Sequence, residues 1–166
     1  MEIVNKVAQS GIITIDMERF FPEEPPYSLD ISQFLFKGLL LKEIDFRSAL
    51  KTFDWSVLKN KNVAVFCGTD AIIPQWAYML IGVYLEAAGA KGYFGNIPVV
   101  ELQILLENLR LISADEYKDQ KVVIKGCGTR PLPDAAYLEI SKKLLPEVKS
   151  LMFGEPCSTV PIYKKK

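Results

Sequence analysis

Four short, almost continuously apolar runs, separated by segments of helical length, constrain the fold of this chain more than any other feature. Such runs are typical of parallel strands that are covered on both faces. Strands that alternate with helices predict right-handed βαβ crossovers and an α/β domain. The strand runs are residues 63–66, 92–94, 122–124 and 150–153, and the predicted helices are 71–88, 98–109 and 133–148. We therefore expect a three-layer domain with a mostly parallel sheet, whose four core strands lie in the order 2-1-3-4.

The first sixty residues have a different pattern and predict an N-terminal β/α extension. A strand is expected at residues 11–17, a weak edge strand around Leu29 and Ile31, and an amphipathic helix at residues 43–53. No Gly- or Ser-rich linker follows, so we expect one domain over residues 1–166, with 1–60 as the extension and 61–166 as the βαβ core. The pattern leaves open whether the extension joins the sheet or packs on a partner subunit.

Composition excludes several kinds of chemistry. The 166 residues contain no histidine, which rules out a Ser-His-Asp triad, an imidazole base and histidine ligands to a metal. The 20 Lys and Arg balance the 20 Asp and Glu, so no basic excess favours nucleic acid or anionic lipid. The longest uncharged run, residues 71–85, is too short to span a membrane. Residues 1–10 lack the pattern of a secretory signal. From the charge balance and the short uncharged run we expect neither nucleic-acid nor membrane partners.

The three cysteines occur in a recurring context. Residues 58–69 (LKNKNVAVFCGT) and 117–129 (YKDQKVVIKGCGT) form a near-repeat with one inserted residue, Gly126. A third, reduced copy is Cys157-Ser158-Thr159. Each cysteine is followed by a small residue and a threonine, although the chain has only five threonines. Each also comes directly after a predicted strand.

Binding sites in open parallel sheets form at the carboxyl ends of the strands, beside a switch in strand order. In the order 2-1-3-4, the strands that end near Cys67, Cys127 and Cys157 are neighbours, about 4.8 Å apart. We therefore expect the three thiols to bind one zinc ion or [4Fe–4S] cluster, because sulfur ligands favour these groups. Asp70 and Glu155 are candidates for a fourth ligand. The ends of the helices that follow are expected to lower the thiol pKa values.

The residues beside the cysteines are the candidate cofactor-binding residues. This set comprises Gly68, Thr69, Gly128, Thr129, Ser158 and Thr159. Glycines here also fit an anion-binding nest or simple turn geometry. Lys125 and Arg130 flank Cys127, where they either neutralise an anionic site or are solvated. Acidic residues in an expected loop near the N-terminus form a further, lower-ranked group: Asp16, Glu18, Glu23 and Glu24.

Three alternatives stay open from the residues alone. Buried cysteines at strand ends are often only packing residues. The same thiols also suit a metal-free enzyme for sulfur transfer or disulfide exchange. The apolar segment 71–88 and the N-terminal part favour a third possibility, a non-enzymatic homodimeric interaction protein. Whether the chain is an enzyme is left open.

Four stretches together carry a resemblance over nearly the whole chain: GIITID, PQWAYML, VVIKGCG and FGEPCSTVPIYK. With them the chain resembles an uncharacterised family, domain of unknown function 2480, found mainly in Bacteroidota. The last two stretches are the most specific, and each contains a cysteine. The resemblance carries no catalytic assignment. It implies a cytoplasmic protein and iron–sulfur assembly proteins as partners, which favours a cluster over zinc.

Overall fold

The computed structural model describes residues 11–166, so the interpretation of residues 1–10 as lacking a secretory signal lies outside the described part. The chain divides into two compact units, which are described separately. The central unit is Pro22–Gln103, and the terminal unit combines the residues up to Phe21 with Ile104–Lys166. The predicted division at residue 60 matches neither boundary. That the whole chain is one domain stays a prediction.

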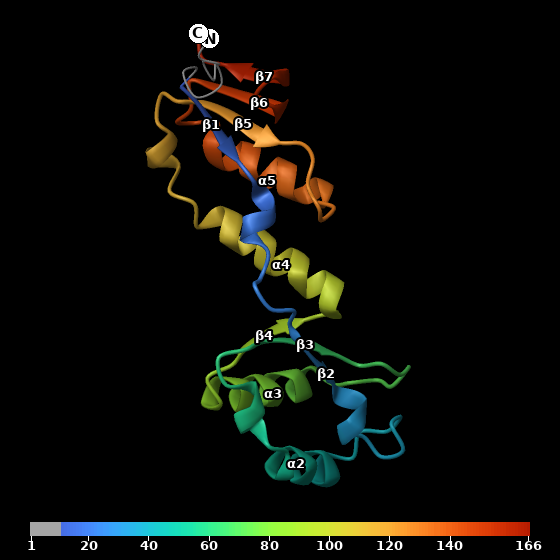
Figure 1. The fold of residues 1–166 in the computed structure, drawn as a ribbon. Coiled ribbons are helices and arrows are strands. Elements are labelled where there is room, and N and C mark those ends of the chain that lie inside the picture. The colour runs from blue at the N-terminus through green and yellow to red at the C-terminus, as the bar shows by residue number, and fades with distance from the viewer. Residues whose placement is uncertain (1–10) are drawn as a thin grey trace, which may run out of the picture. The chain divides into compact units, whose positions relative to one another are not determined.

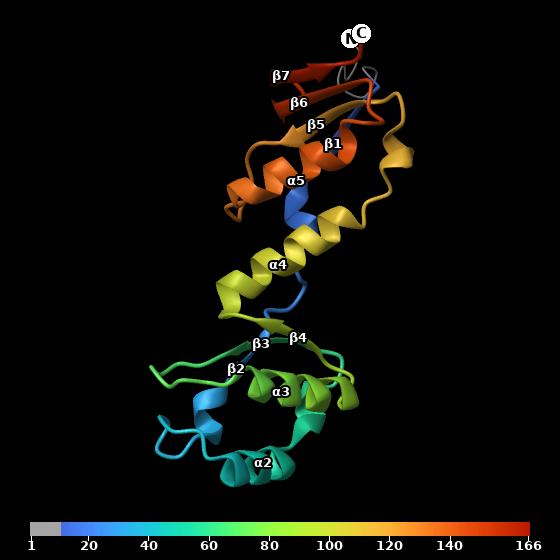
Figure 2. The same ribbon diagram turned by 180° about the vertical axis from the view of Figure 1, so that it is seen from behind.

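The central unit is built on a three-stranded parallel sheet in the order β2-β3-β4. Phe46 and Leu50 of α2 pack with Ala77 and Ile81 of α3 in the core beside the sheet, and α3 lies along the sheet in both views (Figures 1 and 2). The strands are β2 (Tyr27–Asp30), β3 (Asn62–Phe66) and β4 (Lys91–Phe94), the α-helices are α2 (Glu43–Thr52) and α3 (Gln75–Ala87), and the 3-10 helices are η2 (Ile31–Phe34) and η3 (Trp55–Leu58).

The terminal unit has a four-stranded sheet in the order β1-β5-β6-β7, in which only β7 is antiparallel. Its core joins Val122 and Ile124 of β5 to Ile140 of α5 and to Leu105 and Leu109. The strands are β1 (Ile12–Ile15), β5 (Lys121–Lys125), β6 (Ser150–Glu155) and β7 (Ser158–Lys164), and the helices are η1 (Met17–Phe20), η4 (Ala114–Tyr117) and α5 (Asp134–Leu144). Helix α4 (Ile97–Arg110) contains the boundary between the units.

The α/β class and the parallel strands are confirmed, but the predicted strand order is wrong. The order 2-1-3-4 needs β3 beside β5, whereas β3 pairs with β2 and β4, and β5 pairs with β1 and β6. The prediction placed β3 and β5 next to each other. Instead, the short N-terminal strand β2 lies beside β3, and the short N-terminal strand β1 lies beside β5. They extend the sheets, and each extends a different one. The backbone groups of every strand need hydrogen-bonding partners. The four-residue strands β1 and β2, whose sequence signals are weak, supply these partners to β5 and β3, and the strands therefore form two sheets instead of one.

The near-repeat detected in the sequence extends to a whole structural repeat. Each unit runs strand, 3-10 helix, α-helix, 3-10 helix, strand, α-helix, strand, with α4 serving as the first α-helix of the terminal unit. Asn60 and Asp119 both adopt left-handed φ angles, of 61° and 54°, just before the central strand. Pro74 and Pro133 are the N-caps of α3 and α5, with nearly equal backbone angles. The two units are therefore two versions of one supersecondary structure.

Strand β7 was not predicted, and because of it Cys157 lies in a hairpin turn and not in a loop between a strand and a helix. Cys157 lies in the turn between β6 and β7, and Ser158 and Thr159 begin β7 opposite Glu155 and Gly154. The proposed third copy of the repeat is therefore a hairpin, without the helix that follows Cys67 and Cys127. The strand was not recognised in the sequence because it contains Pro161, and proline within a strand is confined to edges and bulges. Here it lies on an edge strand beside a register shift.

Candidate functional site

The clearest chemical contact in the terminal unit joins a thiol to a carboxylate. Cys127 follows β5, and its Sγ donates a hydrogen bond of 2.9 Å to Oε1 of Glu155, the last residue of β6. Cys127 is solvent-exposed, and Glu155 is partly buried. The hydrogen bond to Glu155, and then its negative charge, raise the pKa of Cys127 above the ordinary thiol value. The contact places two atoms of kinds that bind metal ions side by side, the soft sulfur of Cys127 and a hard carboxylate oxygen of Glu155.

Glu18 of η1 holds the loop that carries Cys127. Its Oε1 accepts a hydrogen bond of 2.6 Å from the backbone N–H of Arg130, and its Oε2 accepts one of 3.3 Å from Oγ1 of Thr129. A Cβ at Gly128 would overlap the Glu18 carboxylate, so only glycine permits this close approach. The Arg130 guanidinium also lies 3.6 Å from the centre of the Phe21 ring. The loop is thus fixed from the N-terminal segment of the chain.

A second carboxylate, Asp16, completes this support. It caps η1 by accepting a hydrogen bond from the backbone N–H of Glu18, and it accepts another of 3.0 Å from Nζ of Lys125. The hydrogen bond from Lys125 is the main cause that lowers the pKa of Asp16, and the same bond raises the pKa of Lys125. Lys125 therefore neutralises Asp16, which answers the question that the sequence left open about this lysine.

The central unit repeats this arrangement around Cys67. Oδ1 of Asp30 caps η2 and also accepts a hydrogen bond of 2.9 Å from the backbone N–H of Gly68. Oγ1 of Thr69 donates a hydrogen bond of 2.6 Å to the Gly38 carbonyl oxygen. The Cys67 thiol is half-buried and donates to the Thr69 carbonyl at 3.4 Å. In both units, a carboxylate beside the first strand holds the Cys-Gly-Thr loop in place.

The predicted site residues fall into two groups. Cys67, Gly68, Thr69 and Asp70 belong to the central unit, and Cys127, Gly128, Thr129, Glu155, Cys157, Ser158 and Thr159 belong to the terminal unit. The structure brings Cys127 and Glu155 into contact. Within residues 11–166, it contains no group of three or more Cys, Asp or Glu side chains arranged to hold a metal ion. The three-thiol cluster is therefore not preassembled in the described part of the chain.

The prediction that helix ends lower the thiol pKa values is wrong for Cys127, whose pKa is raised. Helix α5 begins at Asp134, several residues after the cysteine, and the effect of a helix end is confined to its first turn. The nearby Glu155 carboxylate acts in the opposite direction. In the central unit, Asp70 is an exposed loop residue, and Pro74 rather than Asp70 is the N-cap of α3.

The anchoring roles of Asp16, Glu18 and Asp30 were not predicted from the sequence. Asp16 and Glu18 were expected in an exposed loop, because prolines follow them in the sequence. A signal was present, since both ITIDMERF and YSLDISQF contain a β-rich run, an aspartate and a phenylalanine four residues later. In the structure, both aspartates cap 3-10 helices that end at these phenylalanines. Aspartate at such a position accepts from the backbone N–H two residues on.

Residues 1–165 match the family model of a protein of unknown function, DUF2480. The chain belongs to this family. The match confirms the resemblance inferred from the four sequence stretches. No curated protein and no solved structure matches the chain. Among the described residues, no helix is both long and apolar enough to cross a membrane.

Proposed function

We propose that the chain binds a thiophilic metal ion as cargo in its terminal unit, with Cys127 and Glu155 as two ligands. The observation that carries this proposal is the 2.9 Å contact between the Cys127 thiol and the Glu155 carboxylate. Removing the thiol proton places two negative charges side by side, and that repulsion contributes to the raised pKa of Cys127. A bound cation reverses this penalty, because it is attracted to both groups.

The distance between the two groups also suits a shared metal ion. Zinc binds thiolate sulfur at about 2.3 Å and carboxylate oxygen at about 2.0 to 2.2 Å, which separates tetrahedral S and O ligands by roughly 3.5 Å. The present separation of 2.9 Å needs to grow by about 0.6 Å. A mixed sulfur and oxygen ligand pair favours a single ion such as Zn²⁺ over an iron–sulfur cluster, which prefers thiolates.

Cys157 is the proposed third ligand. It lies two residues after Glu155 in the exposed turn between β6 and β7, where a side-chain rotation does not disturb the core. The remaining position is then open to an outside ligand, and an incomplete site suits delivery of a metal better than structural support. Cys67 and Asp70 belong to the central unit and are not ligands in this proposal. A cytoplasmic location and iron–sulfur assembly proteins as partners are also part of it.

The metal-free thiol enzyme is a weaker alternative. A nucleophilic cysteine needs a lowered pKa so that the thiolate is present at neutral pH. The structure raises the pKa of Cys127. The contact with Glu155 therefore keeps the proton on the thiol unless a cation replaces it.

The test is zinc binding by the full chain, measured by titration calorimetry and by metal analysis after anaerobic purification. We expect one ion per chain in the wild type, loss of binding in Cys127→Ser, and binding weakened by about tenfold or more in Glu155→Gln. Cys67→Ser is the matched control and should bind zinc normally. Retention of normal zinc binding by Cys127→Ser would overturn the proposal, as would a metal-free wild type that takes up neither zinc nor iron. Purified protein that is brown and contains iron and sulfide would show that the cargo is an iron–sulfur cluster and not zinc.

A homodimer is also proposed, with α3 as the contact surface. Met79 and Val83 lie one turn apart on α3, and their side chains are 73% and 64% exposed. Exposed apolar side chains at this spacing favour packing against another helix. Light scattering should show a dimer in the wild type and a monomer in Met79→Lys. A wild type that stays monomeric at high concentration would remove this part of the proposal.

A further inference from the structure

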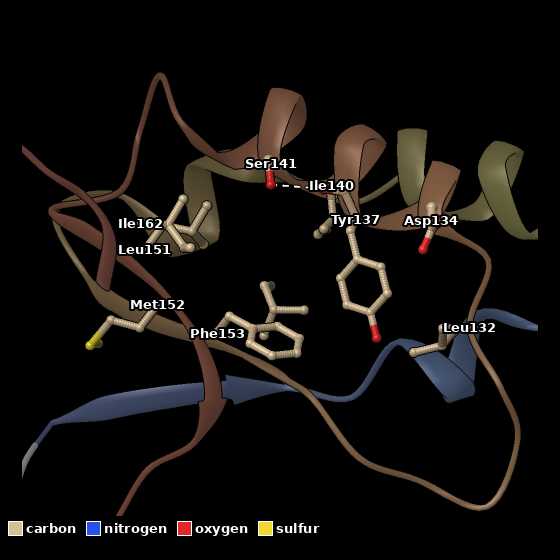
Figure 3. A pocket seen from close by; sticks show the side chains of 10 residues that line it. Leu132, Asp134, Tyr137, Ile140, Ser141, Leu151, Met152, Phe153 and Ile162 are labelled. Carbon is tan, nitrogen blue, oxygen red and sulfur yellow. Dashed lines mark hydrogen bonds between the residues drawn. The ribbon is translucent and has the colours of Figure 1, made fainter. Parts of the chain in front are cut away.

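The terminal unit contains a cavity of about 580 Å³ between α5 and the sheet. Helix α5 covers β5 and β6, and Ile162 of the edge strand β7 also lines the cavity. The apolar part of the lining includes Leu132, Met152 and Phe153. In Figure 3 the Tyr137 and Phe153 rings lie beside each other, and the Met152 side chain points away from them. Cavities of roughly 300 to 1,000 Å³ with an apolar lining are typical of small-molecule sites.

Two polar groups from α5 lie in the same lining. Asp134 and Tyr137 are three residues apart, so they project from the same face of the helix. Desolvation, and then the negative charge of Asp134, raise the pKa of Tyr137, which places the carboxylate within electrostatic range of the phenol. Asp134 is exposed, and within residues 11–166 no ion pair to it is formed. The cavity lining contains no lysine or arginine.

The structural repeat provides an internal comparison. The edge of one aromatic ring meets the face of another in both units, between Tyr78 and Phe94 at 5.5 Å and between Tyr137 and Phe153 at 5.8 Å. Phe94 is 67% exposed, so burial in the core does not explain why both units have this pair. The equivalent cavity in the central unit measures only about 130 Å³, and Gln75 takes the place of Asp134 at the start of the helix.

We propose that the cavity of the terminal unit binds a small organic cation with an apolar body and an ammonium group. The body packs against Leu132, Phe153 and Ile162, and the ammonium group pairs with the Asp134 carboxylate. The faces of the Tyr137 and Phe153 rings also attract a cation, which adds to this preference. The central unit has the aromatic pair but lacks both the charge and the volume, so it does not bind the same ligand.

The probe is 2-phenylethylammonium, and its size-matched anionic counterpart is phenylacetate. We expect saturable chemical-shift changes in the NMR spectrum of the full chain at Tyr137, Phe153 and Ile162 with the cation. Phenylacetate should bind at least about threefold more weakly, as expected for a partly exposed ion pair. Tyr78 and Phe94 should not shift. Equal affinity for the two probes, or shifts centred on Tyr78 and Phe94, would overturn the proposal.

Two variants separate charge from cavity volume. Asp134→Asn should remove the preference for the cation while leaving the chain folded, and Asp115→Asn, an exposed carboxylate on η4, is the matched control. Ser141→Leu should fill the cavity and abolish binding of both probes, with folding checked by circular dichroism. Unchanged binding in either cavity variant would contradict the proposal. A wild type whose lining residues shift with protein concentration alone would show instead that a second copy occupies the cavity. Zinc binding through Cys127 is independent of all these outcomes.

Discussion

The Glu18 carboxylate accepts a hydrogen bond of 2.6 Å from the backbone N–H of Arg130, which lies 112 positions later in the chain. This contact ties the N-terminal 3-10 helix to the loop that carries Cys127. We expect Glu18→Ala to destabilise the terminal unit by about 1 to 2 kcal/mol, because it leaves the loop N–H without its acceptor. Hydrogen exchange at the Arg130 amide should accelerate. Glu23→Ala, at an exposed loop position, is the control, and equal effects of the two variants would contradict this role.

Two glycine substitutions should have opposite effects on stability. At Gly128 a Cβ overlaps the Glu18 carboxylate, so Gly128→Ala should lower the melting temperature by displacing that side chain. At Gly82, within α3, a Cβ meets nothing within 4 Å, so Gly82→Ala should stabilise the chain by about 0.5 to 1 kcal/mol through helix propensity. Thermal unfolding measures both. A neutral Gly128→Ala would show that Glu18 moves aside without cost.

The Asp16–Lys125 pair predicts how stability depends on pH. The pKa of Asp16 lies below its ordinary value of 3.8, so its contribution is present above that value and is lost as pH falls through the lowered pKa. The pKa of Lys125 lies above 10.5, so its contribution is present below that value and is lost as the pH rises through the raised pKa. Lys125→Met should reduce both the loss of stability at low pH and the loss of stability at high pH. Urea unfolding across pH checks this, with exposed Lys121→Met as the control that keeps the wild-type profile.

The Glu155 carboxylate should control the reactivity of Cys127. Because it raises the thiol pKa, Glu155→Gln should move the midpoint of alkylation by iodoacetamide to lower pH and accelerate labelling near neutral pH. Peptide mass spectrometry resolves the rate at each cysteine. Cys67 serves as an internal reference within the same sample and should keep its profile. An unchanged midpoint for Cys127 would mean that the contact is not maintained in solution.

The two aromatic pairs should differ in their contribution to stability. Phe153 is 38% exposed and packs against Gly126 as well as Tyr137, whereas Phe94 is 67% exposed. We expect Phe153→Ala to cost about 1 to 2 kcal/mol and Phe94→Ala less than about 1 kcal/mol. Chemical denaturation compares them directly. A larger effect at Phe94 would mean that it is covered in solution, for example by a partner.

The site could be predicted only in part. Cys127 and Glu155 were both named from the sequence, and they are in contact because parallel pairing of β5 with β6 brings their carboxyl ends together. The anchors Asp16 and Glu18 were set aside, because nothing local shows that β1 pairs with a strand more than 100 residues later. Strand pairing over such a separation is a property of the whole chain, so proximity in sequence carries no information about it.

The sequence by itself determined the α/β class, the four helices and the repeat of strand, Cys-Gly-Thr loop and helix. These follow from hydrophobic period, proline positions and local hydrogen bonding, which act within one or two turns of chain. Only the tertiary structure decided that the strands form two sheets and that Cys67 belongs to one unit while Cys127 and Cys157 belong to the other. The physical reason is that β1 and β2 are only four residues long and have weak sequence patterns. Backbone hydrogen bonds and core packing with residues distant in the sequence determine which strands they pair with.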